Sequence, residues 1–394
     1  MKKKSALSLI FLTVFIDLLG FGILIPILPT FAKKELLVDE TAIGIVVAIY
    51  SFVQLLFNPI LGRLSDKYGR KPLIVISLFI NSIGYIIFAF TTSYIVLLLS
   101  RIVAGIGGSS ISVAQAYVAD VTTKEDRTKG MGMIGAAFGL GFVFGPFMGG
   151  ILSSYGYMIT GFASASFSML AFFVTIILLP ESNLNRAVST DINRKLLDVD
   201  GFKNVFAKPE RVILILLFFV LTFSFANIYG TFALLGLQVY GFSDMQNGFM
   251  FTIIGLTSAI VQGGLIGRIS KAVDRKTILK IGSFLIMIAL ALIPFGVSFL
   301  GLAIICIFLS IGTGIFQPTV LSLISEVTPE TEQGVTLGVN QSVSAFARVL
   351  GPLWGGFAFE FLGYPFPFLT GAAFTLIIFI VTVFYIPKRI MFND

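Results

Sequence analysis

Long, uninterrupted apolar runs are the feature that most limits what this chain can fold into. A helix of about 20 apolar residues crosses a bilayer core of about 30 Å, whereas membrane β-strands would show alternating segments of about ten residues. The runs here are continuous, so we predict an all-α integral membrane protein. Its twelve expected spans lie near 7–31, 42–61, 73–91, 95–118, 131–153, 160–180, 211–236, 247–266, 278–297, 300–323, 336–358 and 365–387.

Composition supports this class and excludes several others. Only 12% of the residues are charged, about half the roughly 25% of soluble proteins. A single cysteine, Cys306, and the absence of histidine exclude an intrachain disulfide, cysteine-based metal clusters, the familiar zinc sites and histidine triads. With no nucleophile–base pair and no cofactor motif, we expect neither an enzyme nor a bound cofactor or metal.

The basic residues predict the orientation of the spans. If the N-terminus is inside, 23 of the 27 basic residues lie in inside segments. Lys33 and Lys34 lie outside, and Arg101 and Arg348 lie within spans. This bias follows the positive-inside rule and explains the net charge of +7 without a nucleic-acid partner. We expect both termini to be cytoplasmic and the first apolar run, too long for a signal peptide, to be a span.

The two halves of the chain repeat each other. The stretch "GRLSDKYGRK" (62–71) recurs as "GRISKAVDRK" (267–276), and Gly145-Pro146 recurs as Gly351-Pro352. Six spans in each half enter the membrane in the same sense, and parallel repeats of this kind bind substrate near the midplane. We predict an N-terminal bundle over 1–180, a cytoplasmic linker over 181–210 and a C-terminal bundle over 211–394.

Four stretches resemble the motifs of a known family. "GRLSDKYGRKP" (62–72) is similar to the signature loop of the major facilitator superfamily. The others resemble motifs of its twelve-span drug:proton antiporter branch, which includes the tetracycline efflux proteins: "FIDLLGFGILIPILP" (15–29), "RIVAGIGGSS" (101–110) and "GAAFGLGFVFGPFMGG" (135–150). The resemblance covers essentially the whole chain and implies two pseudo-symmetric six-helix bundles and antiport by alternating access.

The resemblance also implies a gating role for the loop after the second span. Asp66, Arg70 and Asp120 would form a charge network that closes the inside, and Asp66 could also cap the start of the eleventh span. For Lys67 and Lys71 we favour a role in topology alone. The expected gating residues are Gly62, Asp66, Gly69, Arg70 and Asp120.

Asp17 and Arg101 are the candidates for proton coupling. Asp17 lies about ten residues into the first span, roughly 15 Å deep at 1.5 Å per residue, where a charge is costly and suggests function. Arg101 begins a small, polar face of the fourth span, and its side chain could reach Asp17. We predict that Asp17 carries the proton and that Arg101 tunes its affinity; the alternative for Asp17 is a hydrogen bond that packs helices.

A glycine-rich motif occupies the fifth span. In the family it is a packing surface against the other half near the outer side, and ordinary helix packing is the alternative. Its residues are Gly135, Gly139, Gly141, Gly145, Pro146, Gly149 and Gly150.

Other polar residues within spans are candidates for substrate binding. Arg348 could bind an anionic group, donate to backbone carbonyls or share Asp17. Residues 227–230 are where we expect a local break in a helix. The full candidate set is Gln54, Asn58, Gln115, Asn227, Tyr229, Gln317, Asn340, Gln341 and Arg348.

Together these observations predict a proton-coupled antiporter that exports small amphipathic or drug-like compounds. The alternative is a facilitator of an anionic metabolite, sugar or lipid head group anchored by Arg348, and a receptor without transport would leave Asp17 unused. We expect a monomer in the cytoplasmic membrane whose partners are lipid, protons and a small-molecule substrate.

Overall fold

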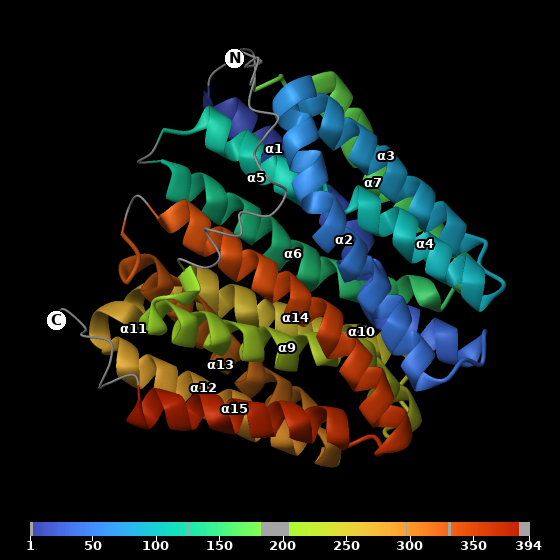
Figure 1. Cartoon of the computed structure of the whole chain (residues 1–394). Coiled ribbons are helices and arrows are strands. Elements are labelled where there is room, and N and C mark those ends of the chain that lie inside the picture. Colours follow the sequence, from blue (N-terminus) through green and yellow to red (C-terminus); the bar gives the residue numbers. More distant parts are fainter. Residues whose placement is uncertain (1–2, 124–125, 183–204, 297, 330–331, 386–394) are drawn as a thin grey trace. The chain divides into compact units, whose positions relative to one another are not determined.

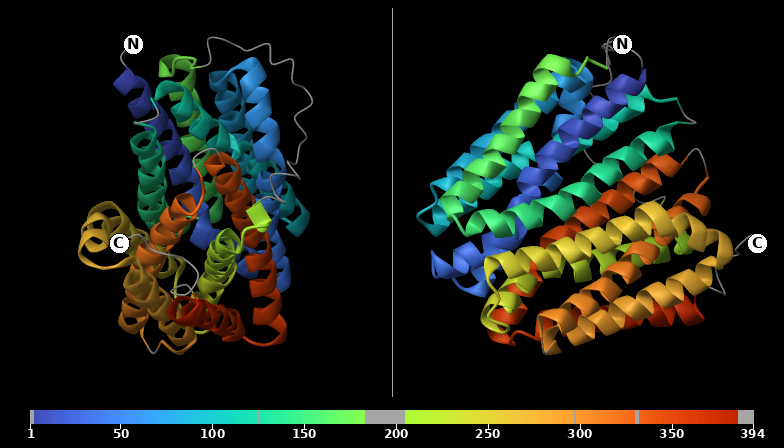
Figure 2. Two further views of the ribbon diagram at one scale, coloured as in Figure 1. Left: turned by 60° about the vertical axis from the view of Figure 1, so that its left-hand side comes forward. Right: turned by 180° about the vertical axis from the view of Figure 1, so that it is seen from behind.

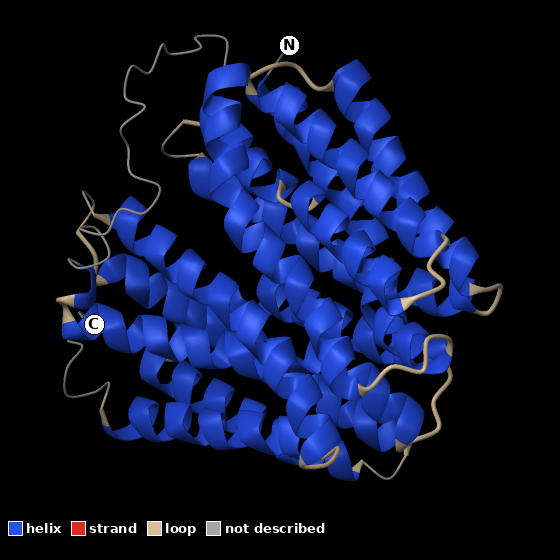
Figure 3. Ribbon diagram, turned by 45° about the vertical axis from the view of Figure 1, so that its right-hand side comes forward, coloured by secondary structure: helices blue, strands red, loops and turns tan. Residues whose placement is uncertain are grey.

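The computed structural model describes the whole chain except residues 1–2, 124–125, 183–204, 297, 330–331 and 386–394. Every regular element in the described part is a helix, and these helices are joined mainly by short loops (Figures 1 and 3). The predicted all-α membrane fold is therefore confirmed.

Seven helices precede the linker in the described part of the chain. They are α1 (Lys3–Lys34), α2 (Glu40–Tyr68), α3 (Arg70–Ala89), α4 (Tyr94–Gly107), α5 (Ser110–Val121), α6 (Arg127–Ser153) and α7 (Tyr157–Leu178). Gly69, between α2 and α3, has a φ of +104°, a backbone conformation that favours glycine because it lacks a Cβ atom.

The second half repeats this succession of helices. Its elements are α9 (Pro209–Gln238), α10 (Asp244–Ile260), the π-helix η1 (Val261–Leu265), α11 (Ile266–Ala272), α12 (Arg275–Leu292), the 3₁₀ turn η2 (Ile293–Phe295), α13 (Phe299–Glu326), α14 (Gln333–Phe361) and α15 (Phe366–Phe384). Helix α3 packs against α4 and α7, and α12 packs in the same way against α13 and α15.

Eleven described segments are long and apolar enough to cross a membrane, with α4 and α5 forming one of them and α10 to α11 another. Helix α14 has 29 residues and occupies the place of the remaining predicted span. Its mean hydropathy is lower than that of the other eleven segments, because the polar residues Asn340, Gln341 and Arg348 interrupt its apolar sequence.

Helical irregularities lie at other positions than the sequence predicted. The expected break at 227–230 is wrong, because α9 is continuous through these residues. The fourth span is instead interrupted at Gly108 and Ser109, and the eighth contains the π-helix around Gly263 and Gly264. Such π-helical turns are often found at functional sites.

The described residues form two compact units. The first takes its residues from Met1–Asp39, Ile49–Arg194 and Gly236–Thr252, and the second from Glu40–Ala48, Lys195–Leu235 and Ile253–Asp394. These ranges differ from the predicted domains in two segments. One is the first turns of α2 (Glu40–Ala48), and the other is Gly236–Thr252, which runs from the end of α9 into α10. Most of the predicted linker lies outside the described residues.

Close contacts at glycines explain why each of these two segments packs with the unit that is formed mainly by the other half of the sequence. A Cβ atom on Gly248 of α10 would lie 2.5 Å from the carbonyl oxygen of Pro146 and 3.0 Å from the Cα of Gly150, both on α6. Gly44 of α2 faces Pro352 and Gly356 of α14 in the same way. The repeated Gly-Pro sequence thus gives each unit one close contact between helices that are distant in sequence.

The first unit is built around α1. This helix lies against α6 and α7, and α6 runs beside it in both views of Figure 2. A Cβ atom on Gly22 would lie 2.6 Å from the carbonyl oxygen of Gly141, and one on Gly145 would lie 2.6 Å from the Cα of Gly22. Small residues let membrane helices approach this closely, and the contact fixes where Asp17 lies.

Candidate functional site

Asp17 lies in the interior of the first unit, where α1, α3 and α7 meet. Its side chain is 5% exposed. The hydroxyl of Ser168 donates to Asp17 Oδ1 at 2.5 Å, and Nδ2 of Asn81 donates to the same oxygen at 2.8 Å. Asn81 also donates to Ser168 at 3.2 Å. The carboxyl group is therefore held by neutral hydrogen-bond donors from two other helices.

A cavity adjoins this carboxyl group. Asp17 and Thr13 contribute to its lining from α1, and Ser110 contributes from the start of α5. The other lining residues are Val14, Ile74, Leu78, Ile111 and Ala114. Apart from Asp17 and the hydroxyl groups of Thr13 and Ser110, the cavity is lined by apolar side chains. Water needs polar partners, so the part of the cavity near these three residues is suitable for it.

Arg101 has a different environment. It is 3% exposed, its guanidinium lies over the rings of Tyr85 and Phe88 at 5.9 and 5.6 Å, and its Nε donates to Ser100 at 3.3 Å. No ion pair joins it to Asp17 among the described residues. The rings provide a cation–π environment for the charge, and Tyr85 is near both charged groups.

The predicted substrate residues are distributed among several environments. Gln54 donates to the backbone of Gly108 at 3.0 Å, and Asn227 is 1% exposed and donates to the carbonyl of Pro367 at 2.5 Å. Both side chains therefore join helices. Gln317 and Gln341 are exposed. Gln54 is partly buried, and the other partly buried members of the set are Asn58, Gln115, Tyr229 and Arg348.

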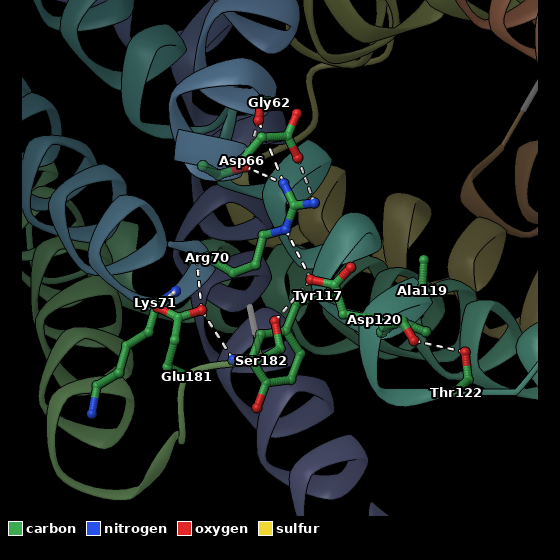
Figure 4. Close-up of polar contacts among 12 residues, drawn as sticks. Gly62, Asp66, Arg70, Lys71, Tyr117, Ala119, Asp120, Thr122, Glu181 and Ser182 are labelled. Carbon is green, nitrogen blue, oxygen red and sulfur yellow. Dashed lines mark hydrogen bonds and ion pairs between the residues drawn. The ribbon is translucent and has the colours of Figure 1, made fainter. Parts of the chain in front are cut away.

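Arg70 is the centre of the inner polar cluster, which we define as Asp66, Arg70, Asp120, Glu181 and Ser182 (Figure 4). Arg70 is 8% exposed. It pairs with Asp66 at 2.6 Å and with Asp120 at 3.0 Å, and it also donates to the hydroxyl of Ser65 at 2.5 Å. The structure thus brings together the three charges that the family resemblance linked.

Glu181 was not singled out in the sequence, although it belongs to this cluster. Its carboxylate accepts the backbone N–H groups of Arg70 at 2.9 Å and Lys71 at 3.2 Å, so it caps the start of α3. Ser182 donates to Asp120 at 2.9 Å. A carboxylate at a helix N-terminus is favourable because of the helix dipole, but no local sequence pattern signals a cap from 110 residues away.

The two aspartates of this cluster, Asp66 and Asp120, are expected to contribute unequally to stability. Asp120 is less exposed than Asp66, with 27% against 59% of its side chain accessible. We therefore expect Asp120→Asn to lower the free energy of unfolding by about 1–3 kcal/mol and Asp66→Asn by less than about 1 kcal/mol. Thermal unfolding of the purified variants in detergent would measure the difference, and a larger loss for Asp66→Asn would contradict this ranking.

The second half has its own ion pair at the matching position. Arg275, the counterpart of Arg70 in the repeat, pairs with Glu326 at the end of α13, as Arg70 pairs with Asp120 at the end of α5. Asp274 replaces Gly69 and accepts the backbone N–H of Thr277 at 3.0 Å. Hydrogen bonds from Thr277 lower the pKa of Asp274. Here the helix is capped locally, whereas α3 is capped by the distant Glu181.

An outer polar cluster, which we define as Lys34, Tyr157 and Asp244, lies at the other ends of the helices. Asp244 begins α10 and is 9% exposed. It pairs with Lys34 at the end of α1 at 3.0 Å and accepts the hydroxyl of Tyr157 at the start of α7 at 2.7 Å. No local sequence pattern indicates these partners, because Lys34 and Tyr157 lie 210 and 87 residues away from Asp244.

The interaction between Lys34 and Asp244 should be measurable as a coupling energy between two substitutions. We expect Asp244→Asn to destabilise the protein more than Lys34→Gln, because Asp244 has two partners and Lys34 is 36% exposed. The double variant should be less destabilised than the sum of the two single variants, with a coupling of about 0.5–1 kcal/mol. Additive effects on thermal unfolding would show that the pair contributes no coupling.

The glycine motif of α6 does not act as one surface. Gly141, Gly145 and Gly149 face α1, and Gly150 faces Asp244 and Met245 of α10. Gly135 has no atom of the described chain within 4 Å of its Cβ position. Gly139 is partly buried. The residues that contact α10, Pro146 and Gly150, therefore lie toward the C-terminal end of the motif.

Buried charge inside spanning helices is typical of ion and substrate pathways, and the fold together with these sites defines a multi-span membrane transporter. A family model described as Major Facilitator Superfamily matches residues 10–352, with a second match over 265–390. The chain belongs to this superfamily.

Similar proteins span nearly the same length. Multidrug resistance protein 1 of Bacillus subtilis (strain 168) is 30% identical over 371 residues, covering 94% of each chain. The class B tetracycline resistance protein of Escherichia coli is 28% identical over 358 residues, covering 89% of this chain and 87% of its own. The solved structure of the human organic anion transporter MFSD10 has a TM-score of 0.72 at 25% identity. The match covers 97% of this chain and 100% of the MFSD10 chain.

Proposed function

We propose that this protein is a proton-coupled antiporter that exports small amphipathic, drug-like compounds by alternating access. The names of the multidrug and tetracycline resistance relatives support the substrate class. The proposal of proton coupling rests on the environment of Asp17. This carboxyl group is buried, and in the described part of the chain it is hydrogen-bonded only to neutral side chains. Such a group can gain and lose a proton without breaking an ion pair.

In this proposal the carboxyl group of Asp17 takes a proton from the outer side and releases it to the inside. The cavity beside Asp17 provides room for water next to the carboxyl group. Arg101 makes no contact with Asp17 in the described chain and would act from a distance, with Tyr85 near both groups. Asn81 and Ser168 keep the carboxyl group in one orientation through the cycle.

The inner and outer polar clusters are proposed as the gating elements. Each joins helix ends by ion pairs that solvent can replace when the helices separate, so their formation and loss would accompany the change of access. The bias of basic residues toward one side supports a cytoplasmic membrane protein with both termini in the cytoplasm. We propose a monomer as the functional unit, since all the groups used here belong to one chain.

Transport in proteoliposomes would test the proposal. Vesicles loaded at acidic pH and diluted into alkaline buffer should accumulate ethidium, a permanently charged amphipathic cation, and release protons as they do so. Nigericin in equal potassium on both sides collapses the pH gradient and should stop the accumulation. Uptake that is unchanged by nigericin would overturn proton coupling, and a protein that moves no amphipathic dye would overturn the export proposal.

A further inference from the structure

Arg348 is a charged residue that the proposed transport cycle does not use. It lies near the middle of α14 (Gln333–Phe361), with both helix ends roughly 20 Å away at 1.5 Å per residue. A guanidinium at such a depth is costly unless it has a partner or faces a polar region. Among the described residues it makes no hydrogen bond and no ion pair.

No acid of the second unit is placed to pair with Arg348. Each acidic residue described in that unit lies at a helix end, and several are engaged there: Glu332 with Arg211, Glu326 with Arg275, and Glu360 with the backbone N–H of Thr41. The full set is Glu40, Glu210, Asp274, Glu326, Glu332 and Glu360. The charge of Arg348 is therefore uncompensated by the described part of its own unit.

Arg101 provides an internal comparison. It also lacks an acidic partner in the described chain, but it is almost fully buried beneath two aromatic rings that stabilise its charge. Arg348 is only partly buried, and its electrostatic neighbour is the phenol of Tyr229 on α9. Arg348 is therefore more exposed than Arg101.

A second unsatisfied group lies on the same face of α14. Asn340 precedes Arg348 by eight residues, about two turns or roughly 12 Å, and it is 2% exposed with a side-chain oxygen that has no partner in the described chain. Tyr229 packs edge-on against Phe225, with ring centroids 5.6 Å apart. One helix face therefore offers a cation and an amide, with the phenol of Tyr229 near the cation and Phe225 behind that ring.

We infer that Arg348, with Tyr229 and Asn340, forms a subsite for amphipathic organic acids. The guanidinium would bind the carboxylate or sulfonate group through paired N–H donors, the rings would contact the apolar body, and Asn340 would hydrogen-bond a polar group at its other end. The inference rests on the proposed export function, because it names the substrate class that such a transporter would accept.

Binding of a matched dye pair would test this subsite directly. Rhodamine B carries a free carboxylate, and its ethyl ester differs only in masking that group. Fluorescence anisotropy with the purified full-length protein should show tighter binding of the acid than of the ester. We expect Arg348→Gln to weaken binding of the acid tenfold or more while changing binding of the ester less than twofold.

Further variants separate a binding role from a structural one. Arg348→Lys keeps the charge and should retain a preference for the acid. Asn340→Leu should weaken the binding of both dyes to a similar extent. Lys271→Gln, which removes a positive charge from the last turn of α11, is the matched control and should leave both affinities unchanged. A single thermal transition near that of the wild type would show that each variant is folded.

Two results would overturn the inference. One is a wild-type protein that does not prefer the acid to the ester, which requires no variant to interpret. The other is a folded Arg348→Gln protein in which binding of the acid and binding of the ester are weakened equally. Failure of the export proposal is distinguishable, because the proteoliposome assay would then show no gradient-driven dye uptake even if the acid still bound preferentially.

Discussion

Asp17→Asn is expected to abolish gradient-driven transport while leaving the protein folded. Asparagine has nearly the shape of a protonated aspartic acid, and its amide oxygen can accept the same bonds from Ser168 and Asn81. It cannot bind or release a proton. Loss of a proton-transfer group costs about 100-fold or more, so accumulation of ethidium against its gradient should fall to the level of empty vesicles.

Exchange measurements would separate proton coupling from movement of the protein. Because the introduced asparagine resembles the protonated state of Asp17, exchange of labelled for unlabelled dye without a pH gradient should persist in this variant. Asp126→Asn, which changes an exposed acid at the start of α6, is the control and should transport as the wild type does. Uphill transport retained by Asp17→Asn would show that another group carries the proton.

Gly145→Leu is expected to prevent folding of the first unit. A Cβ atom at residue 145 would lie 2.6 Å from the Cα and 2.7 Å from the carbonyl carbon of Gly22. These are backbone atoms of α1, so the clash cannot be relieved by a side-chain rotation. The cost should exceed the roughly 1–3 kcal/mol of ordinary overpacking, and yield and monodispersity in detergent would report it.

A comparison within α6 controls for the loss of glycine itself. Gly135→Ala places a methyl group where no described atom lies within 4 Å, and alanine favours a helix over glycine by about 1 kcal/mol. This variant should be as stable as the wild type or more stable, whereas Gly145→Ala should be less stable. Equal melting temperatures for the two alanine variants would contradict the observed packing of α1 against α6.

The spans were predictable because a bilayer imposes a length and an apolarity that single residues cannot mask. Even α14 was recognised, although Arg348 and Asn340 reduce its apolarity, because its flanking runs are long enough. The predicted break at 227–230 failed for a physical reason: Asn227 has its amide group bonded to α15, so the polar side chain joins two helices without disturbing its own.

The site was less predictable than the fold because its contacts join distant segments. Asp17 was recognisable from its depth alone, whereas Asn81 and Ser168 are ordinary polar residues until α3 and α7 bring them to it. The place of Arg101 over Tyr85 and Phe88 depends on rings one span away. Glu181 likewise acquires its role only when the end of α7 meets the start of α3.

The exchange of helix segments between the two units has a consequence for the evolution of such a chain. Gly248 of α10 packs on α6 in the first unit, and Gly44 of α2 packs on α14 in the second. A gene cut at the linker would therefore encode two halves, each lacking one segment that its own unit requires. If the two halves arose by duplication, an ancestral six-span protein would have met the same need through a second copy of itself.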